Sequence, residues 1–421
     1  MAGRYWIETL GCPKNQVDSD KLVGTLVADG LEAARSPAEA DVVVVNTCAF
    51  IEAARQESVD TVLGLAQVRR PGARLVVTGC LAERYGDALA EAMPEADQVA
   101  GFGVPIELGT RPTAPPDMAR LDLLNLPRPP SAAPWAYVKV AEGCDRACGF
   151  CAIPSFRGPQ RSRSVGAILA EVDGLGVAEV VLVAQDLASY GRDDGRSGAI
   201  VDLVATVAER VRRVRLLYLY PSELNSRLID VICATGVPYF DLSLQHVSRP
   251  LLRRMRRWGD GERFLDRIHA IRDREPDAAF RSSFIVGYPG ETEDDHDRML
   301  AFLSDAQLDW AGFFAFSPEE GTYAAGLDGA VDDALVSERL RELGELQDAI
   351  TASRRAALVG RTIEVLVDGP GVGRSHREAP EIDGIVTVPP TLPVGDIVSV
   401  AVTGAAGPDL EATWPASGAL R

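Results

Sequence analysis

Three closely spaced cysteines constrain this chain more than any other feature of its sequence. The stretch at residues 143–151 reads Gly-Cys-Asp-Arg-Ala-Cys-Gly-Phe-Cys, so Cys144, Cys148 and Cys151 follow a C-x3-C-x2-C spacing. Three thiolates on one short loop suit a 4Fe–4S cluster with one iron left open to bind a cofactor or substrate. The alternatives are coincidence and a structural zinc site. Zinc normally takes four protein ligands, and no fourth cysteine or histidine lies close in the sequence.

The pattern around this loop predicts a βα barrel. Apolar runs alternate with helical patterns, and six of these runs are expected to be strands: residues 136–140, 179–183, 215–219, 239–244, 279–286 and 311–316. Six βα units predict a partial or full TIM-like barrel. The cysteine loop follows the first of the six strands. It is therefore expected at the carboxyl-end mouth of the barrel, where the reacting groups of such folds gather.

A second set of cysteines follows the predicted strands of the N-terminal part. Residues 5–9, 41–46 and 74–78 are expected strands, and residues 19–28 and 51–65 are expected helices, which implies a parallel sheet. Cys12, Cys48 and Cys80 each come just after one of the strands. The carboxyl ends of parallel strands share one edge of a sheet, so the three thiols can converge on a common site. The alternative is three separate cysteines that fill the core.

Composition divides the α/β chain into three domains and a linker. We predict an N-terminal cluster domain at residues 1–113, a proline-rich linker at 114–134, the βα domain at 135–357 and a small antiparallel β-barrel at 358–421. Strands of the last domain are expected at 362–368, 384–388 and 396–402. The tail after Gly407 is expected to be loosely ordered.

Length, composition, charge and cysteine count indicate the kind of protein and its cellular compartment. Its 421 residues are 46% hydrophobic and 25% charged, which allows a sizeable core. No apolar run reaches membrane-spanning length and no signal segment precedes the first strand, so a cytoplasmic protein without membrane association is expected. Seven cysteines in that compartment indicate metal or redox use. The net charge of −18 serves either solubility or a basic partner.

The three-cysteine loop, with Phe150 directly before its last cysteine, resembles the signature of the radical S-adenosylmethionine (AdoMet) superfamily. The resemblance implies that the open iron binds the amino and carboxylate groups of AdoMet. One electron from a low-potential donor then cleaves the cofactor to a 5′-deoxyadenosyl radical. The protein's part is to orient the cofactor and to exclude side reactions.

The two cysteine sets together resemble the methylthiotransferase family over essentially the whole chain. The resemblance implies an N-terminal cluster domain, a radical AdoMet domain and a C-terminal barrel called TRAM. It implies two 4Fe–4S clusters, one on each cysteine set, and two AdoMet molecules per turnover, one as radical source and one as methyl donor. It also implies a sulfur donor as a partner. No side chain is expected as a general acid or base, because the chemistry lies on the clusters.

Several stretches resemble the RimO branch of this family, which modifies the β-carbon of an aspartate in small-subunit ribosomal protein S-twelve. They are Gly-Cys-Pro-Lys-Asn at 11–15, Val-Asn-Thr-Cys-Ala-Phe-Ile at 45–51, Ser-Pro-Glu-Glu-Gly-Thr at 317–322 and Ala-Pro-Glu-Ile-Asp-Gly at 379–384. The tRNA-modifying branch usually has Gln-Met in place of Pro-Lys after the first cysteine. Two departures, His376 in place of the branch's usual tyrosine and the proline-rich stretch 388–393, concern substrate contacts more than the chemistry.

Further residues have both a functional and an ordinary interpretation. The candidates for AdoMet contact are Phe150, Gln185, Gln245 and Gly287, of which the last three end predicted strands. Turn chemistry explains the same residue types equally well. His246 fits a general base or a satisfied structural histidine. The basic run at 253–257 fits a charged helix face better than a nucleic-acid contact, and Cys233 fits core packing.

Three functions are therefore weighed: methylthiolation of a ribosomal protein, methylthiolation of a tRNA adenosine, and a non-enzymatic iron–sulfur carrier or RNA-binding protein. A carrier needs no AdoMet-binding barrel mouth, which argues against the third. From residue 358 onward the chain has four basic and eight acidic residues, the reverse of what an RNA-binding barrel needs. An acidic barrel attracts a basic protein, so a ribosomal protein or the ribosome is the expected partner and tRNA is not.

Overall fold

A five-stranded parallel sheet forms the N-terminal part of the chain in the computed structural model, which describes residues 3–106 and 122–414. Its order is β2-β1-β3-β4-β5, with β1 at Arg4–Thr9, β2 at Glu32–Ala33, β3 at Val42–Thr47, β4 at Arg74–Gly79 and β5 at Gln98–Ala100. Strand β3 is buried along its whole length. Helix α1 (Pro13–Ala28) packs on one face of the sheet, and α2 (Glu52–Val68) and α3 (Cys80–Ala92) pack on the other. The alternation expected from the sequence is thus present.

The first helix begins at Pro13, six residues before the start expected at residue 19. Proline at the first helical position is favoured because its fixed φ suits a helix and its missing N–H has no partner to lose there. Cys12 is therefore the residue directly before the helix, in extended conformation. This early start carries Lys14 and Asn15 on the first turn of α1, beside the cysteine.

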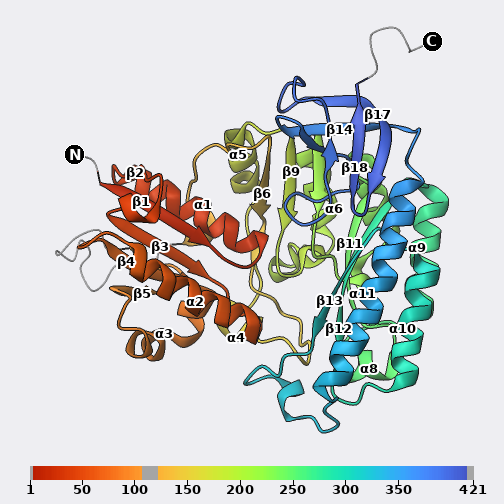
Figure 1. Ribbon diagram of the computed structural model, residues 1–421, viewed down its shortest axis with the longest axis horizontal. Coiled ribbons are helices and arrows are strands. Elements are labelled where there is room, and N and C mark those ends of the chain that lie inside the picture. Colours follow the sequence, from red (N-terminus) through yellow and green to blue (C-terminus); the bar gives the residue numbers. More distant parts are fainter. Residues whose placement is uncertain (1–2, 107–121, 415–421) are drawn as a thin grey trace.

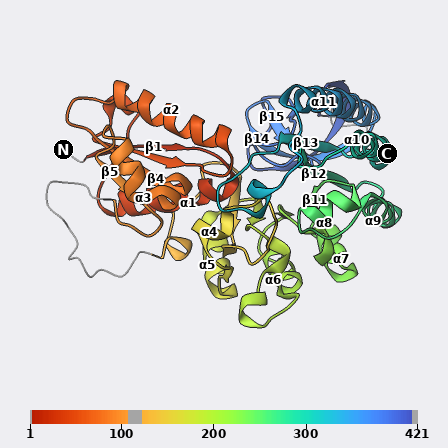
Figure 2. The ribbon, with the colours of Figure 1, turned by 90° about the horizontal axis from the view of Figure 1, so that it is seen from below.

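Six parallel strands form the central part as an open half-barrel (Figures 1 and 2). They are β6 (Trp135–Lys139), β9 (Glu179–Val183), β10 (Arg213–Leu216), β11 (Tyr239–Gln245), β12 (Ala279–Val286) and β13 (Trp310–Ala315). The sheet is pinched in its middle, where one bridge between Leu219 and Leu242 joins the two sets of three strands. Strand β10 ends at Leu216, three residues before the expected position 219, and Tyr218 just beyond it has a φ of 67°, outside the β region.

Helices cover the outer face of the half-barrel and bury one large apolar core with it. They are α5 (Val165–Leu175), α6 (Ala199–Ala208), α7 (Ser226–Ala234), α9 (Gly261–Arg274), α10 (Glu293–Ala306) and α11 (Asp333–Ala356). Two short helices, α4 (Ile153–Arg157) and α8 (Arg249–Arg254), and the small ribbon of β7 (Ala141–Glu142) and β8 (Arg161–Ser162) lie near the strand ends. The inner face packs against Val17 of α1 and Ala379 of the C-terminal part.

A closed five-stranded barrel forms the C-terminal part, above the strands of the half-barrel in Figure 1. Its strands are β14 (Thr362–Gly369), β15 (Val372–Arg374), β16 (Val386–Thr387), β17 (Ile397–Ala406) and β18 (Asp409–Thr413). The expected loose tail after Gly407 is wrong for residues 409–413, because β18 pairs with both β17 and β16 and closes the barrel. The barrel is also not purely antiparallel, since β16 and β18 run parallel.

The second half of the proline-rich linker is fixed against α1. Residues 114–121 lie outside the described part, and residues 122–134 run along the helix with Leu124 buried. A Cβ on Gly24 would stand 2.5 Å from the carbonyl oxygen of Pro127, so a glycine is required at this approach. Within residues 3–106 and 122–414, no helix is both long and apolar enough to cross a membrane.

Candidate functional site

The C-x3-C-x2-C loop is clamped by backbone contacts at the carboxyl end of β6. The N–H of Cys144 donates to the carbonyl of Gly158 at 3.1 Å, and the N–H of Gly149 donates to the carbonyl of Met255 at 2.8 Å. Gly143 has a φ of 78°, and a Cβ on it would lie 2.1 Å from the carbonyl oxygen of Pro159. Contacts within the chain therefore hold the loop in this shape.

The three thiols of this loop lie close together and beside positive charge. Burial raises the pKa of Cys144 to about 11 and that of Cys151 to about 12, and the neighbouring cysteines add to both shifts. The charge of Arg257 opposes the raised pKa of Cys151. Its Nη1 also donates to the sulfur of Cys148 at 3.1 Å. A cation beside a thiol favours the thiolate, which is the form that binds metal.

Cys12, Cys48 and Cys80 converge at the carboxyl edge of the N-terminal sheet. Burial raises the pKa of Cys48 to about 12, and the charges of Cys12 and Cys80 raise it further. Burial also raises the pKa of Cys12, but Lys14, Arg157 and two backbone N–H groups outweigh it, so the net shift is downward. The three strand ends thus deliver one group of interacting thiols.

Two glycines let the backbone of this edge close up. Gly11 and Gly79 precede Cys12 and Cys80, with φ values of 92° and 91°. A Cβ on Gly11 would stand 2.9 Å from the sulfur of Cys48, and one on Gly79 would stand 2.3 Å from Oδ1 of Asn46. The Gly-Cys pair is required here for the same reason as at Gly143: only glycine allows both the conformation and the contact.

Asn15 and Arg157 tie the N-terminal cysteine set to the half-barrel. Asn15 is fully buried, and its Nδ2 donates to the carbonyls of Leu10 and Thr47 at 2.8 and 3.1 Å. Arg157, which closes helix α4 after the radical-type loop, donates from Nη2 to Oδ1 of Asn15 at 2.7 Å and to the sulfur of Cys80 at 3.1 Å. One guanidinium on the half-barrel therefore contacts a ligand candidate of the other domain.

A buried charge network holds Arg157 in place. Its Nη1 donates to both oxygens of Glu142 at 2.9 Å and to Asp18 at 3.2 Å. Lys139 pairs with the same two carboxylates. Burial opposes ionisation of Glu142, yet Arg157 and Lys139 lower its pKa far below the usual range. The network fixes the distance between the N-terminal sheet and the half-barrel.

The donor set fits iron–sulfur clusters better than single metal ions. Within the described residues, no three His, Cys, Asp or Glu side chains lie close enough to hold one ion. Thiolates around a single zinc must all stand about 2.3 Å from the metal. A 4Fe–4S cluster is larger, because it holds its thiolate ligands apart on separate irons. Two groups of three interacting thiols, each on glycine-shaped backbone beside an arginine, suit the larger unit.

The four residues proposed for AdoMet contact lie at the carboxyl end of the half-barrel in different settings. Phe150 packs against the main core, and Gln245 ends β11 with a φ of 71°. Nε2 of Gln185 donates to Glu142 at 2.6 Å, while its Oε1 is buried without a hydrogen bond. At Gly287 the N–H donates to Glu291 at 2.5 Å, and a Cβ would stand 2.4 Å from Val336. Packing alone thus accounts for the glycine.

His246 has a structural environment. It is buried, and its Nδ1 accepts a hydrogen bond from the N–H of Ser248 at 3.0 Å. Burial lowers its pKa to about 4, so the ring is neutral near neutral pH. Cys233 is half-buried against the main core, as its place on an apolar helix face predicts.

The basic run at 253–257 packs against the cysteine loop. Arg254 pairs with Asp328 at 2.8 Å, Arg256 stacks on Tyr323, and Arg257 reaches Cys148. The carbonyls of this turn hold Gly149 and Tyr288. Only Arg253 and Arg256 are exposed, so the run mainly supports the loop.

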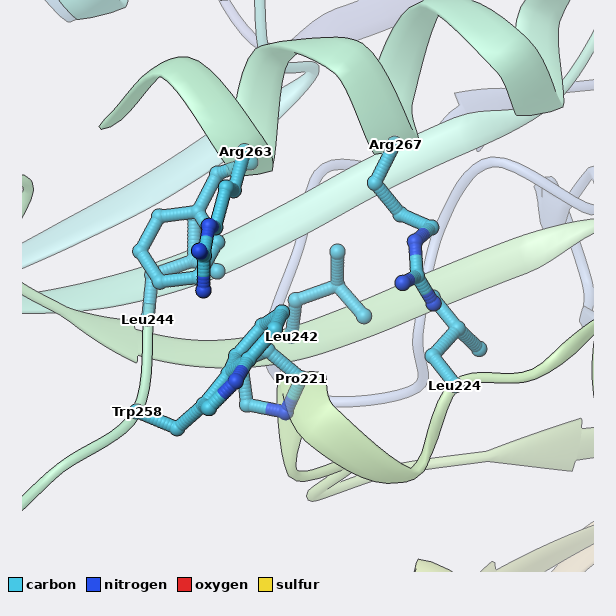
Figure 3. A pocket seen from close by; sticks show the side chains of 8 residues that line it. Pro221, Leu224, Leu242, Leu244, Trp258, Arg263 and Arg267 are labelled. Atoms are coloured by element: carbon cyan, nitrogen blue, oxygen red, sulfur yellow. The ribbon is translucent and has the colours of Figure 1, made fainter. Parts of the chain in front are cut away.

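Trp258, at the end of this run, covers a small and mostly apolar pocket beside α9 (Figure 3). Its lining residues are Pro221, Leu224, Leu242, Leu244, Trp258, Arg263, Phe264 and Arg267. None of the lining residues is a cysteine or one of the four AdoMet-contact candidates. The pocket is therefore separate from the two thiol groups.

Two of the sequence stretches singled out for their resemblance lie at contacts between the three parts of the chain. Glu319 pairs with Arg55 and Arg84 of the N-terminal part. In the stretch 379–384, the carbonyl of Pro380 accepts from Tyr137 at 2.8 Å, and Asp383 accepts from Tyr239 at 2.6 Å.

His376 also lies at a contact between two parts of the chain. It is largely buried, and its Nε2 lies 2.8 Å from the carbonyl oxygen of Asp277 in the half-barrel. Burial lowers its pKa to about 4, so the ring is neutral. This departure from the usual tyrosine therefore lies at the domain contact and not on the exposed barrel surface.

The sequence does not single out Lys14 or Arg157, and it does not indicate that Arg257 contacts a cysteine. Lys14 and Asn15 sit in a motif that was noticed, but no pattern says which side chains of a motif face a site. Arg157 carries no signal of its own among the 43 lysines and arginines of the chain.

Comparisons with known families cover most of the chain. Residues 4–101 match the Uncharacterized protein family UPF0004, residues 138–303 match the Radical SAM superfamily, and residues 359–414 match the TRAM domain. The chain is 43% identical to the ribosomal protein uS12 methylthiotransferase RimO of Moorella thermoacetica, over 95% of this chain and 96% of that protein. It is 42% identical to the protein of the same name from Cutibacterium acnes, over 96% of both chains.

Among solved structures, the chain resembles the radical S-adenosylmethionine methyltransferase TsrM from Kitasatospora setae, solved with cobalamin and a [4Fe-4S] cluster bound. The TM-score is 0.51 at 13% identity, over 88% of this chain and 80% of that one. At this identity the likeness concerns the fold: a sheet domain that precedes a radical-type half-barrel.

Proposed function

The chain belongs to the RimO family of radical AdoMet methylthiotransferases, and from that premise we propose that it adds a methylthio group to the β-carbon of an aspartate in ribosomal protein uS12. The observation that carries the proposal is the presence of two separate thiol groups, one of which is tied to the half-barrel by Arg157. One group suits radical generation, and the other suits delivery of sulfur. A protein that only carried clusters would need neither the half-barrel mouth nor the link.

We assign one 4Fe–4S cluster to Cys144, Cys148 and Cys151 and a second to Cys12, Cys48 and Cys80. The cluster of the first set, with AdoMet, supplies the one-electron chemistry that removes hydrogen from an unactivated carbon; the second set supplies the sulfur. Two AdoMet molecules per turnover follow from the family. Reconstituted protein should bind about eight irons per chain, four for each cluster.

The chain's own residues position these groups. Arg257 and Arg157 donate to the sulfurs of Cys148 and Cys80; burial raises the pKa of Cys80, and the charge of Arg157 opposes that shift. Phe150, Gln185, Gln245 and Gly287 line the strand ends where AdoMet would lie. Of these, Gln185 offers a buried acceptor without a partner, and so it is the best candidate for contact with an amino group.

The domain limits follow from the same assignment. We place the cluster domain at 1–113, the linker at 114–134, the radical AdoMet domain at 135–357 and the TRAM barrel at 358–421. The three family matches fall inside these limits. Helix α11 and the contacts of Glu319 support a radical domain that extends beyond residue 303.

A protein substrate suits the surface of the C-terminal barrel better than tRNA does. Two of its arginines, Arg374 and Arg377, are buried in ion pairs with carboxylates. The exposed acidic residues of the described barrel are Glu364, Glu381, Asp396 and Glu411, against one exposed basic residue, Arg361. RNA binding requires an excess of positive charge, whereas a basic ribosomal protein is attracted to this surface. The ribosome would be met in the cytoplasm, with a low-potential electron donor and a sulfur donor as further partners.

Mass spectrometry of a host strain tests the proposal. The strain should lack its own uS12 methylthiotransferase and carry either this chain or an empty vector. We expect the methylthio mass on uS12 only with this chain, and no change in tRNA. Modified tRNA with unmodified uS12 would favour the tRNA alternative. In anaerobic assays with AdoMet and dithionite, absence of 5′-deoxyadenosine would favour the non-enzymatic carrier.

A further inference from the structure

Lysine is rare in this chain and occurs only in its interior. Of the 43 basic residues, three are lysines: Lys14, Lys21 and Lys139. All three are buried, with 8%, 0% and 0% of their surface exposed. A buried ammonium group needs a counter-charge, because burial without one costs several kcal/mol.

Two of the three lysines have that counter-charge within the chain. Lys21 lies 3.4 Å from Glu171 and donates to the carbonyl of Leu124. Lys139 lies 2.7 Å from Glu142 and also pairs with Asp18. These two lysines are structural, since every carboxylate they need is already folded against them.

Lys14 has no such partner. Within residues 3–106 and 122–414 its ammonium makes no hydrogen bond and no ion pair, and its close contact is the ring of Tyr218, 3.3 Å from Nζ to the ring centre. Asp241, a carboxylate whose charge acts on Lys14, is engaged by the N–H of Tyr218 at 2.9 Å and by Arg281 at 3.2 Å. Three N–H donors of the ammonium therefore remain free.

Tyr218 holds Lys14 from the half-barrel side in a strained conformation. Its φ of 67° is a region that a bulky side chain rarely adopts, and strain of this kind gathers at functional sites. The residue follows β10 directly, at the carboxyl end of the half-barrel. Its ring thus faces a cation that lies two residues beyond Cys12.

We propose that Lys14 binds the side-chain carboxylate of the target aspartate and so selects an acidic residue as substrate. The inference rests on the proposed function. In aspartate the carboxyl carbon is bonded to the β-carbon that receives sulfur. A cation next to Cys12 that holds the carboxylate therefore places the neighbouring β-carbon beside the sulfur-bearing site. Lys14 is a specificity-determining residue in this scheme.

A rival role for Lys14 lies within the protein. Its charge also favours the thiolate of Cys12, so it could serve that cysteine alone. The two roles differ in what they predict for the substrate. A partner of Cys12 affects the N-terminal cluster whatever peptide is present, whereas a carboxylate receptor distinguishes aspartate from asparagine and leaves the cluster in place.

The experiment measures binding of two labelled peptides to the reconstituted holoprotein by fluorescence anisotropy. The peptides carry the modified segment of uS12 with either the target aspartate or asparagine in its place. We expect wild-type protein to prefer the aspartate peptide by about 30-fold or more, the value for one desolvated charge pair. In K14M the preference should vanish while iron content stays that of wild type. K14R keeps a charge and should keep the preference.

The matched control is K21M, which removes a buried lysine that already has its counter-charge. It should retain the preference for the aspartate peptide. The inference fails if K14M keeps both clusters and the full preference, if K14M loses the N-terminal cluster, or if K14R or K21M loses the preference as K14M does. Wild-type protein that binds neither peptide would instead contradict the proposed function, and the inference with it.

Discussion

The two cysteine sets reach similar surroundings by opposite routes. Cys144, Cys148 and Cys151 lie on one loop, which the neighbouring turns at Gly158 and Met255 hold by backbone hydrogen bonds. Cys12, Cys48 and Cys80 come from three strands and meet only because the sheet is parallel. The first site is specified by local spacing and the second by topology. An error in the fold would therefore spare the first and destroy the second.

The two sets nevertheless share one local device. Gly11, Gly79 and Gly143 each precede a cysteine, adopt a positive φ and leave no room for a Cβ. Glycine before cysteine turns the chain sharply at the end of a strand and brings the thiol to the sheet edge. Arg157 then ties the N-terminal site to the half-barrel.

Loss of one cysteine from each set gives the largest expected difference. Cys144→Ala should abolish both AdoMet cleavage and methylthiolation, since it removes a ligand of the radical-generating cluster. Cys12→Ala should keep AdoMet cleavage and abolish only sulfur transfer. Liquid chromatography with mass detection of 5′-deoxyadenosine and of modified peptide measures both. If Cys12→Ala protein cannot cleave AdoMet, the two sites are not independent.

Arg157→Met should perturb the N-terminal cysteine set and its contact with the half-barrel. It leaves Asp18 and Glu142 with less positive charge in a buried setting, which typically costs about 3–5 kcal/mol of unfolding free energy. We expect a lower denaturation midpoint and a lower iron content of the N-terminal set. Arg257→Met should lower iron only at the C-x3-C-x2-C loop. Equal iron loss at both sites in Arg257→Met protein would contradict this expectation, because it would show that Arg257 does not act on the loop alone.

Gly79→Ala tests whether the assembled site depends on close backbone approach. The new Cβ would stand 2.3 Å from Asn46 and 2.6 Å from the backbone of Thr47. Strain at a positive φ alone costs about 1–3 kcal/mol. We expect a lower midpoint of urea denaturation and a lower iron content of the N-terminal set. Gly64→Ala, on helix α2 with open space around it, is the control and should not destabilise the protein.

Cys233→Ser should have the smallest effect. The residue is half-buried on α7 and belongs to neither set, so both clusters and both activities should persist. A serine in its place should cost about 1 kcal/mol or less, as is usual for such positions. Thermal unfolding and iron analysis measure this. A missing cluster in Cys233→Ser protein would make this cysteine a ligand and break the division into two sets of three.

The sequence by itself determined the class of fold and singled out six cysteines as candidate ligands. The pattern of apolar runs placed β9 and β12 at their observed limits. Strand β9 is the clearer case, because a strand buried on both faces needs a continuous apolar stretch such as its Val-Val-Leu-Val. The spacing of the loop cysteines and the strand-end position of the other three are local properties, so they are legible in the chain. Strand β18 was missed because its pairing partners, not its own composition, hold it in place.

Only the tertiary structure decided which charged groups serve the site. Lys14, Arg157 and Arg257 are ordinary basic residues in the sequence, and their contacts with Tyr218, Cys80 and Cys148 span many residues of chain. A charge acquires its function from burial and from the counter-charges around it, and both are fixed only when distant segments pack. For that reason the sequence indicates three lysines, and the fold reveals that one of them has no carboxylate partner among the residues that the structure describes.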